Sequence, residues 1–234
     1  MSSEDLAQRG RRKDRDLERR RSAMIDDIEA GMAATRSLTG RERLGRRVLR
    51  ACRQVRREDF VPPDLRRAAF RDGALPLGYG QTISQPYIVA LMTDLLDLDE
   101  RSRVLEVGTG SGYQAAILSC LAQRVYTIER IAQLAESARK RLRELGYDNV
   151  ETRCGDGYRG WPEQAPFDAI VVTAAAPVVP PMLLEQLKPG GRMVIPVGMP
   201  ARHQELMLVT RDLAGEIHQR SVLAVAFVPM VEDA

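Results

Sequence analysis

Short apolar runs alternate with longer amphipathic stretches from residue 103 to residue 198, and this alternation limits the possible folds more than any other feature. The apolar runs that begin at residues 103, 124, 149, 167 and 192 predict strands, and the stretches between most of them predict helices. Strands and helices that alternate through short turns form a parallel sheet with helices on both faces. Residues 204–230 hold two further strands with no helix between them, which indicates a hairpin. We therefore expect an α/β fold, with a doubly wound, mostly parallel seven-stranded sheet and an antiparallel C-terminal edge hairpin.

The chain divides into a charged N-terminal part and one domain. Eight Arg or Lys residues and three Asp or Glu residues lie between Arg9 and Arg21, although the net charge of the whole chain is only +3. We expect residues 1–35 to form a flexible basic extension, whose mixed signs and lack of interleaved aromatic residues argue against binding to nucleic acid. We expect residues 36–234 to form a single domain, in which residues 41–100 are an N-terminal helical and lid segment. The protein is expected to be a monomer.

The sequence carries no signal for a membrane or a secretory location. No apolar run approaches the ~20 residues that cross a bilayer, and the N-terminus lacks the apolar core of a secretory signal. The three cysteines, Cys52, Cys120 and Cys154, are widely separated and lack metal-ligand spacing. This pattern is typical of reduced thiols, so we expect a cytoplasmic protein without a metal site.

A glycine-rich loop follows the first strand of the alternation. It reads EVGTGSGY from Glu106 to Tyr113 and opens the next predicted helix. Glycines at positions 108, 110 and 112 would let a ligand approach bare backbone. Their spacing is GxGxG, whereas the dinucleotide fingerprint is GxGxxG, which argues against a dehydrogenase. Taken alone, such a loop is also compatible with a tight turn that binds nothing.

Acidic residues follow the next two predicted strands. Glu129 ends the second strand, where a carboxylate can accept hydrogen bonds from both hydroxyls of a ribose. Asp156 and Gly157 follow the third strand, where a carboxylate can accept from an adenine amino group beside a flat glycine surface. Together with the glycine loop, these residues predict an adenosine pocket. Because no Lys or Arg lies in the loop to neutralise a phosphate, the acidic rim favours a cationic nucleoside such as S-adenosyl-L-methionine.

Five further segments stand out in the order LPLGYGQTISQP, VLEVGTGSGYQAAIL, CGDGYRGW, FDAIVVTAAAP and LKPGGRMVIPVG. Taken together, they resemble the protein-L-isoaspartate O-methyltransferase family of class I S-adenosylmethionine-dependent methyltransferases. The glycine loop is shared with most class I methyltransferases, whereas TISQP is more specific to this family. The resemblance implies a Rossmann-like methyltransferase fold. It also implies transfer of a methyl group from S-adenosyl-L-methionine to the free α-carboxylate of L-isoaspartyl residues in damaged proteins and peptides, which initiates their repair through a succinimide.

The resemblance also implies roles for individual residues. Ser84, in the TIS run, would be the catalytic residue. Val89 and Val231 stand where some family members have a histidine and a threonine that contact the cofactor or the substrate, so the resemblance carries no contact over to these positions. The cofactor-binding residues would be Thr82, Ile83, Glu106, Gly108, Thr109, Gly110, Ser111, Gly112, Glu129, Asp156 and Gly157.

The stretch GYGQTISQP, residues 78–86, is expected to be a loop hinged at Gly78 and Gly80 that carries Ser84 over the cofactor. A carboxylate with a pKa of about 3.9 is already an ionised nucleophile at neutral pH. It therefore needs orientation and not a general base, and Ser84 would supply the orientation by a hydrogen bond. The residues leave open two other readings, namely a methyltransferase with a small-molecule carboxylate as acceptor, and a binding module without turnover.

Overall fold

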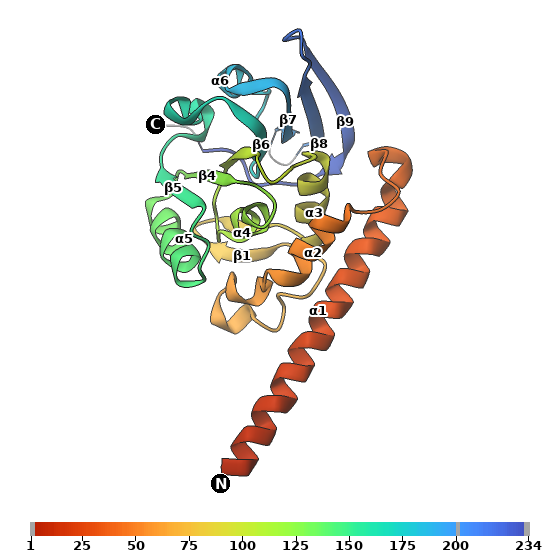
Figure 1. The fold of residues 1–234 in the computed structure, drawn as a ribbon, viewed down its shortest axis with the longest axis vertical. Helices are drawn as coiled ribbons and strands as arrows, with labels where there is room; N and C mark the ends of the chain where they lie inside the picture. Colours follow the sequence, from red (N-terminus) through yellow and green to blue (C-terminus); the bar gives the residue numbers. More distant parts are fainter. Residues whose placement is uncertain (1–2, 200–201, 232–234) are drawn as a thin grey trace.

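One seven-stranded sheet forms the centre of the molecule (Figure 1). Its strands are β3 (Arg103–Val107), β4 (Arg124–Glu129), β5 (Val150–Cys154), β6 (Phe167–Val172), β7 (Leu187–Gly198), β8 (Gln204–Arg211) and β9 (Ile217–Val225). They lie in the order β5-β4-β3-β6-β7-β8-β9, and only the pairings of β8 with β7 and with β9 are antiparallel. The predicted doubly wound, mostly parallel sheet with an antiparallel edge hairpin is confirmed.

The computed structural model describes residues 3–199 and 202–231, so the ends of the two predicted units, residues 1–2 and 232–234, lie outside it. Within the described ranges, no helix is both long and apolar enough to cross a lipid bilayer. The α-helices are α1 (Ser3–Thr39), α2 (Arg46–Gln54), α3 (Pro86–Leu95), α4 (Tyr113–Ser119), α5 (Ala132–Glu144) and α6 (Pro181–Glu185). Short 3-10 segments are η1 (Arg57–Asp59), η2 (Pro63–Leu65), η3 (Gly157–Arg159) and η4 (Pro162–Gln164).

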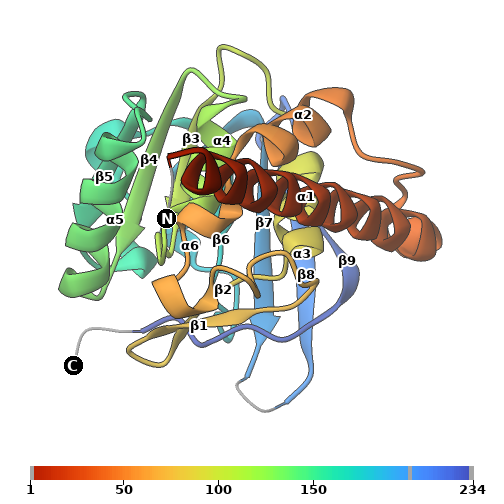
Figure 2. The ribbon, with the colours of Figure 1, turned by 90° about the horizontal axis from the view of Figure 1, so that it is seen from below.

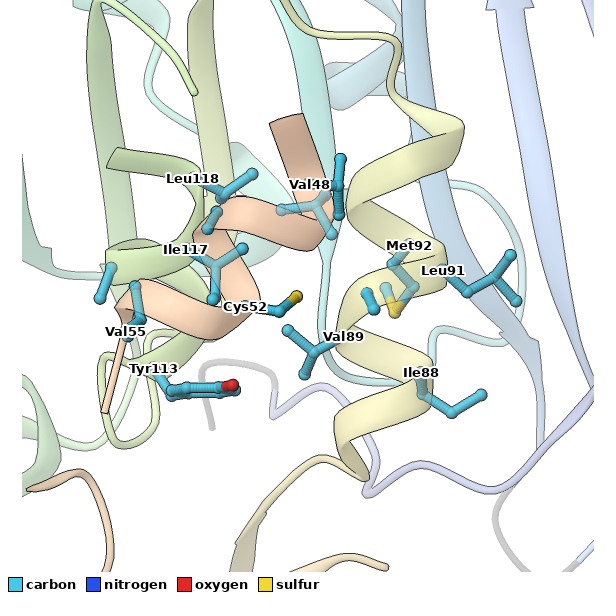
Figure 3. Close-up of a cluster of buried hydrophobic side chains, with 14 of the residues drawn as sticks. Val48, Cys52, Val55, Ile88, Val89, Leu91, Met92, Tyr113, Ile117 and Leu118 are labelled. Atoms are coloured by element: carbon cyan, nitrogen blue, oxygen red, sulfur yellow. The ribbon is translucent and has the colours of Figure 1, made fainter. Parts of the chain in front are cut away.

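Successive residues of the buried strands pack on opposite faces of the sheet, as the two-residue period of a strand requires. In β3, Val104 belongs to the cluster formed with α1 to α4, whereas Leu105 packs with Trp161 and Phe167 on the other face. Both faces are therefore covered, which explains why the strands are almost continuously apolar. Figure 3 shows the first cluster, to which α2 with the residue after it, α3 and α4 contribute Val48, Cys52, Val55, Ile88, Val89, Leu91, Met92, Tyr113, Ile117 and Leu118.

The N-terminal segment differs from the flexible extension expected from its charge. It is a continuous helix, α1, whose N-terminal part projects beyond the rest of the molecule (Figure 1). Met24, Ile25, Ile28 and Met32 are buried in the same cluster as α3. Their spacing is that of an amphipathic helix, and it begins only where the run of arginines ends. The boundary after residue 35 stays a prediction.

Two further segments differ locally from their predictions. The stretch expected to be a loop lies mainly in an antiparallel hairpin, β1 (Leu75–Gly78) and β2 (Gln81–Ile83), which is separate from the central sheet (Figure 2). The stretch before the strand expected from residue 192 predicts a helix over residues 180–191, but only α6 is helical there, because the chain continues from Leu187 as β7. Pro189 lacks a backbone N–H and cannot extend that helix.

Candidate active site

The candidate site lies at the carboxyl ends of β3, β4 and β6. Because β3 lies between β4 and β6, the connections on either side of it diverge, and ligands of open α/β sheets bind at such a switch point. A pocket with about 560 Å³ of space, part of it open to solvent, occupies this position. The strand ends, β2 and the C-terminal segment 228–231 line it.

Gly108 forms part of the pocket wall directly after β3. Its φ is +98°, and its N–H donates to the carbonyl of Ile128 over 2.8 Å. A Cβ at this position would overlap the hydroxyl of Thr173, which donates to the Gly108 carbonyl over 2.6 Å. Both the backbone conformation and the missing space therefore require glycine. The chain passes the pocket as bare backbone, as the sequence predicted.

Glu129 holds its carboxylate at the pocket by two backbone hydrogen bonds. Its Oε2 accepts from the N–H of Gly110 over 2.7 Å, and its Oε1 accepts from the N–H of Ile131 over 3.0 Å. Only 6% of the residue is exposed, and it lines the pocket together with both partners. Each carboxylate oxygen has a further lone pair, so the fixed carboxylate can accept from two neighbouring hydroxyls. Two fixed acceptor oxygens side by side fit the two neighbouring hydroxyls of a ribose.

Glu106 lies beneath the glycine loop and not in the wall of the pocket. Its carboxyl is completely buried, and its Oε2 accepts from the hydroxyl of Thr127 over 2.5 Å. The Thr127 hydroxyl in turn contacts the hydroxyl of Thr109 at 2.6 Å. Burial raises the pKa of Glu106 to about 8, against the hydrogen bond from Thr127, and the neighbouring Glu129 adds to the rise. The structure places Glu106 and Thr109 as supports of the loop, one layer behind its pocket surface.

Helix α5 supports the loop from a second side. The guanidinium of Arg141 donates to the carbonyl of Ser111 over 2.8 Å. Leu142 packs so closely on Gly112 that a Cβ there would lie 3.2 Å from its Cδ1. The later part of the loop is therefore fixed by α5, while Gly110 remains at the pocket.

Asp156 and Gly157 follow β5. The Oδ1 of Asp156 accepts from the N–H of Tyr158 over 2.9 Å, which caps η3. Gly157 lines the pocket, and a Cβ there would lie 2.5 Å from a methyl carbon of Val107. The expected glycine surface is thus part of the pocket, whereas the carboxylate of Asp156 holds the turn that presents it.

The hairpin β1–β2 covers the glycine loop. A side-chain carbon of Leu77 would lie 3.7 Å from a Cβ built on Gly110. The turn at the tip consists of Gly78, Tyr79 and Gly80, whose φ angles are +91°, +54° and +70°. The two glycines adopt these angles without strain, which explains the spacing GYG, and Tyr79 is a largely exposed side chain between them.

Thr82 lies in β2 beside Ile83, which is buried in the core, and Ser84 directly follows the strand. Thr82 lines the pocket described above, the inner pocket, and also a second, outer cleft. Ser84 lies in this outer cleft, half-buried, opposite residues 224–227 at and beyond the end of β9. Thr82 is thus shared by the two cavities, and Ser84 lines the outer cleft alone.

The structure brings Thr82, Gly108, Gly110, Glu129 and Gly157 together around one pocket. Of the other predicted residues, Ser84 lines the second cleft and Ile83 is buried in the core. The remaining ones lie in the glycine loop or next to Gly157 without lining the pocket, and they are Glu106, Thr109, Ser111, Gly112 and Asp156. Sequence reasoning did not assign several further lining residues, which are Gln81, Val107, Ile128, Arg130, Ile131, Thr173, Ala174 and residues 228–231. Val107, Ile128, Arg130 and Ile131 could have been found, since they lie within two residues of Gly108 or Glu129. Val89 is buried in the core, whereas Val231 lies at the pocket.

A family model for protein-L-isoaspartate(D-aspartate) O-methyltransferases matches residues 38–234. Among curated proteins, the protein-L-isoaspartate O-methyltransferase 2 of Syntrophobacter fumaroxidans is 57% identical over 210 residues, which are 90% of this chain and 85% of that protein. The protein of the same name from Polaromonas sp. is 55% identical over 207 residues, which are 88% of this chain and 98% of that protein.

Solved structures agree with these relatives. A protein-L-isoaspartate O-methyltransferase superposes with a TM-score of 0.76 at 28% identity, over 91% of this chain and 66% of the other. A Plasmodium falciparum structure, described as a beta-aspartate methyltransferase in complex with S-adenosyl-L-homocysteine, superposes with a TM-score of 0.73 over 90% of this chain and 98% of the other, and at 23% identity it shows the shared fold alone. The chain belongs to the protein-L-isoaspartate(D-aspartate) O-methyltransferase family.

Proposed function

We propose that the two cavities that meet at Thr82 bind the two substrates of a carboxyl methyltransferase, one in each cavity. The protein transfers a methyl group from S-adenosyl-L-methionine to the free α-carboxylate of L-isoaspartyl residues in damaged proteins and peptides. The inner pocket holds the methyl donor, and the outer cleft holds the acceptor. The observation that carries this proposal is that Thr82 lines both cavities while Ser84, two residues later, lines only the outer one.

The inner pocket suits the adenosine part of the donor. Glu129 offers two acceptor oxygens that backbone N–H groups hold in place, and these would bind the ribose hydroxyls. Gly108 and Gly157 would present flat backbone, because a Cβ at either position meets neighbouring side chains. When bound, S-adenosyl-L-methionine supplies an electrophilic methyl group on a positively charged sulfur. The buried Glu106 behind the loop would favour that charge whenever its carboxyl is ionised.

Ser84 would orient the acceptor. An isoaspartyl α-carboxylate is ionised at neutral pH and therefore already nucleophilic, with an ordinary pKa of about 3.9. A hydroxyl that donates to one carboxylate oxygen leaves the other free to face the inner pocket. Correct placement of reacting groups contributes ~7–11 kcal/mol to the lowering of a barrier. The chain's own residues thus bind and aim the reactants, and no general base is required.

The product of the transfer is a methyl ester, which closes to a succinimide as the neighbouring peptide nitrogen displaces methanol. Hydrolysis of that ring returns part of the population to normal aspartate, which is a repair. The acceptors are isoaspartyl-containing proteins and peptides. We place this activity in the cytoplasm, where thiols such as the buried Cys52 stay reduced, and in a monomer.

The test is methyl transfer to two peptides of identical sequence, one with an isoaspartyl and one with a normal aspartyl residue. With methyl-labelled S-adenosyl-L-methionine, we expect base-labile label in the isoaspartyl peptide and only background label in the aspartyl peptide. Equal labelling of both peptides, or labelling of a small carboxylic acid alone, would contradict the proposed acceptor. Tight binding of S-adenosyl-L-homocysteine without any transfer would favour a binding module instead.

A further inference from the structure

The segment that carries Ser84 is fixed at Tyr87, three residues further along the chain. Tyr87 lies in the first turn of α3, and 6% of it is exposed. Its hydroxyl and its backbone N–H have different partners, and both partners lie outside the TISQP segment. The position of Ser84 therefore depends on which elements hold Tyr87.

Helix α1 holds the side chain of Tyr87. The hydroxyl of Thr35 lies 2.6 Å from the Tyr87 hydroxyl, across 52 positions of sequence. The ring lies against the backbone of α1 at Gly31, where a Cβ would come within 2.7 Å of its Cδ2. Gly31 is thus required for the close approach of helix and ring. Figure 2 shows α1 passing over α3 at this side of the molecule.

Asp72 holds the backbone on the other side. Its Oδ1 accepts from the N–H of Tyr87 over 3.4 Å, and its Oδ2 accepts from the side-chain amide of Gln85 over 2.7 Å. Asp72 precedes the hairpin and Gln85 follows it, so this contact joins the two ends of the segment that contains Ser84. The first turn of α3 has no capping side chain from the preceding Gln85, and Asp72 takes that role from a distance.

A second contact ties α1 to η1, which precedes the hairpin in the chain. The guanidinium of Arg21 on α1 donates to the buried carboxylate of Glu58 over 2.5 Å. The adjacent Arg57, which is completely buried, donates to the carbonyl of Ala69 over 2.9 Å and lies over the ring of Tyr113, at 5.0 Å from its centroid. Helix α1 therefore contacts both the residues that precede the hairpin and the helix that follows it.

We propose that α1 is a positioning element of the active site, which fixes Ser84 through the contact of Thr35 and Gly31 with Tyr87. This inference rests on the proposed function for the role of Ser84, but the contacts that carry it do not. Most of α1 precedes the stretch matched by the family model, which begins at residue 38. Helix α1, most of which the sequence predicted to be a flexible extension, would thus affect the turnover rate.

Two conservative substitutions in the full chain test this role. Thr35→Val and Tyr87→Phe each remove one hydroxyl and keep the packing volume. Each is expected to lower kcat on an isoaspartyl peptide roughly threefold to tenfold, which is the effect of one hydrogen bond. The double variant should lose no more than either single variant, because both remove the same contact. Binding of S-adenosyl-L-homocysteine should stay within twofold of the wild type.

Thr39→Val is the matched control. Thr39 is a threonine of the same helix, and its hydroxyl donates to the carbonyl four residues earlier, as that of Thr35 does. It has no contact with Tyr87 among the described hydrogen bonds, so kcat should match that of the wild type. Wild-type kcat in both Thr35→Val and Tyr87→Phe would overturn the proposal. Equal losses in kcat and in cofactor affinity would also overturn it, since they would indicate general loosening.

Hydrogen exchange separates this inference from the proposed function. In Thr35→Val, the backbone amides of Ser84, Gln85 and Tyr87 should exchange faster than in the wild type, whereas those of residues 108–112 should not change. This result needs no acceptor, so it holds even if the isoaspartyl peptide proves to be the wrong substrate. Unchanged exchange at these three amides would contradict the role of α1 while leaving the proposed function intact.

Discussion

The glycine loop and the β1–β2 hairpin face each other across the candidate site, and the two are held in place in different ways. The loop is fixed by the ends of neighbouring strands, as the hydrogen bonds of Gly108 with Ile128 and of Gly110 with Glu129 show. The hairpin forms no ladder with the central sheet, and its flanks are held by α1 and Asp72. The proposed donor pocket is thus built into the sheet, whereas the proposed placement of the acceptor depends on contacts between distant parts of the chain.

The largest effect on ligand binding is expected from a change in the glycine loop. Gly108→Ala would place a Cβ at a φ of +98° and against the hydroxyl of Thr173. A loop that shifts to relieve strain of this kind has to recover ~1–3 kcal/mol when it closes on its ligand, so binding of S-adenosyl-L-homocysteine should weaken roughly fivefold to a hundredfold. Titration calorimetry measures this directly.

Gly73→Ala is the matched change beside the hairpin. Nothing lies within 4 Å of a Cβ built on Gly73, so the affinity for S-adenosyl-L-homocysteine should stay within twofold of the wild type. Equal affinity of the two alanine variants for S-adenosyl-L-homocysteine would contradict the view that ligand binding requires the backbone of the glycine loop to stay in place.

A smaller effect is expected from the carboxyl group beneath the loop. The pKa of Glu106 is raised from 4.5 to about 8 by burial, so the folded protein keeps this proton after the unfolded chain has lost it. The resulting stabilisation is complete below pH 4.5 and is lost as the pH rises to about 8. Glu106→Gln carries no such proton. The Tm of the variant, relative to that of the wild type, should therefore rise by roughly a few degrees between pH 5 and pH 8.

Thermal unfolding of both proteins across this pH range is the measurement. Glu136→Gln, which changes an exposed glutamate of α5, serves as the control and should run parallel to the wild type. Parallel curves for Glu106→Gln would show that the buried carboxyl is not linked to stability in this range.

The same division explains what could be predicted from the sequence. The order of strands and helices, the loop at Gly108 and the pocket position of Glu129 follow from local patterns, since a strand, a turn and a helix N-terminus each have a signature within a few residues. The pocket position of Gly157 was predicted on the same basis. These residues face the inner pocket because parallel strands end at one edge of the sheet.

The remaining features depend on packing between distant segments. Met24, Ile25, Ile28 and Met32 recur with a helical period, so a helix could be predicted there. The local sequence does not show that this stripe packs against α3. The hairpin was expected to be a loop, because GYG signals a turn and the flanking strands are only three or four residues long. The cofactor contact of Glu106 stays a prediction, and the depth of its carboxyl beneath the loop depends on Thr127 in the next strand.

The central claim is that Ser84 aims the acceptor and takes no part in holding the donor. The most direct test is Ser84→Ala, with kcat on an isoaspartyl peptide and the Kd of S-adenosyl-L-homocysteine measured on one preparation. A hydrogen bond to a charged group is worth ~1.5–3 kcal/mol, so kcat should fall roughly tenfold to a hundredfold while the Kd stays within twofold. A variant with wild-type kcat, or one whose Kd rises as much as its kcat falls, would contradict the account.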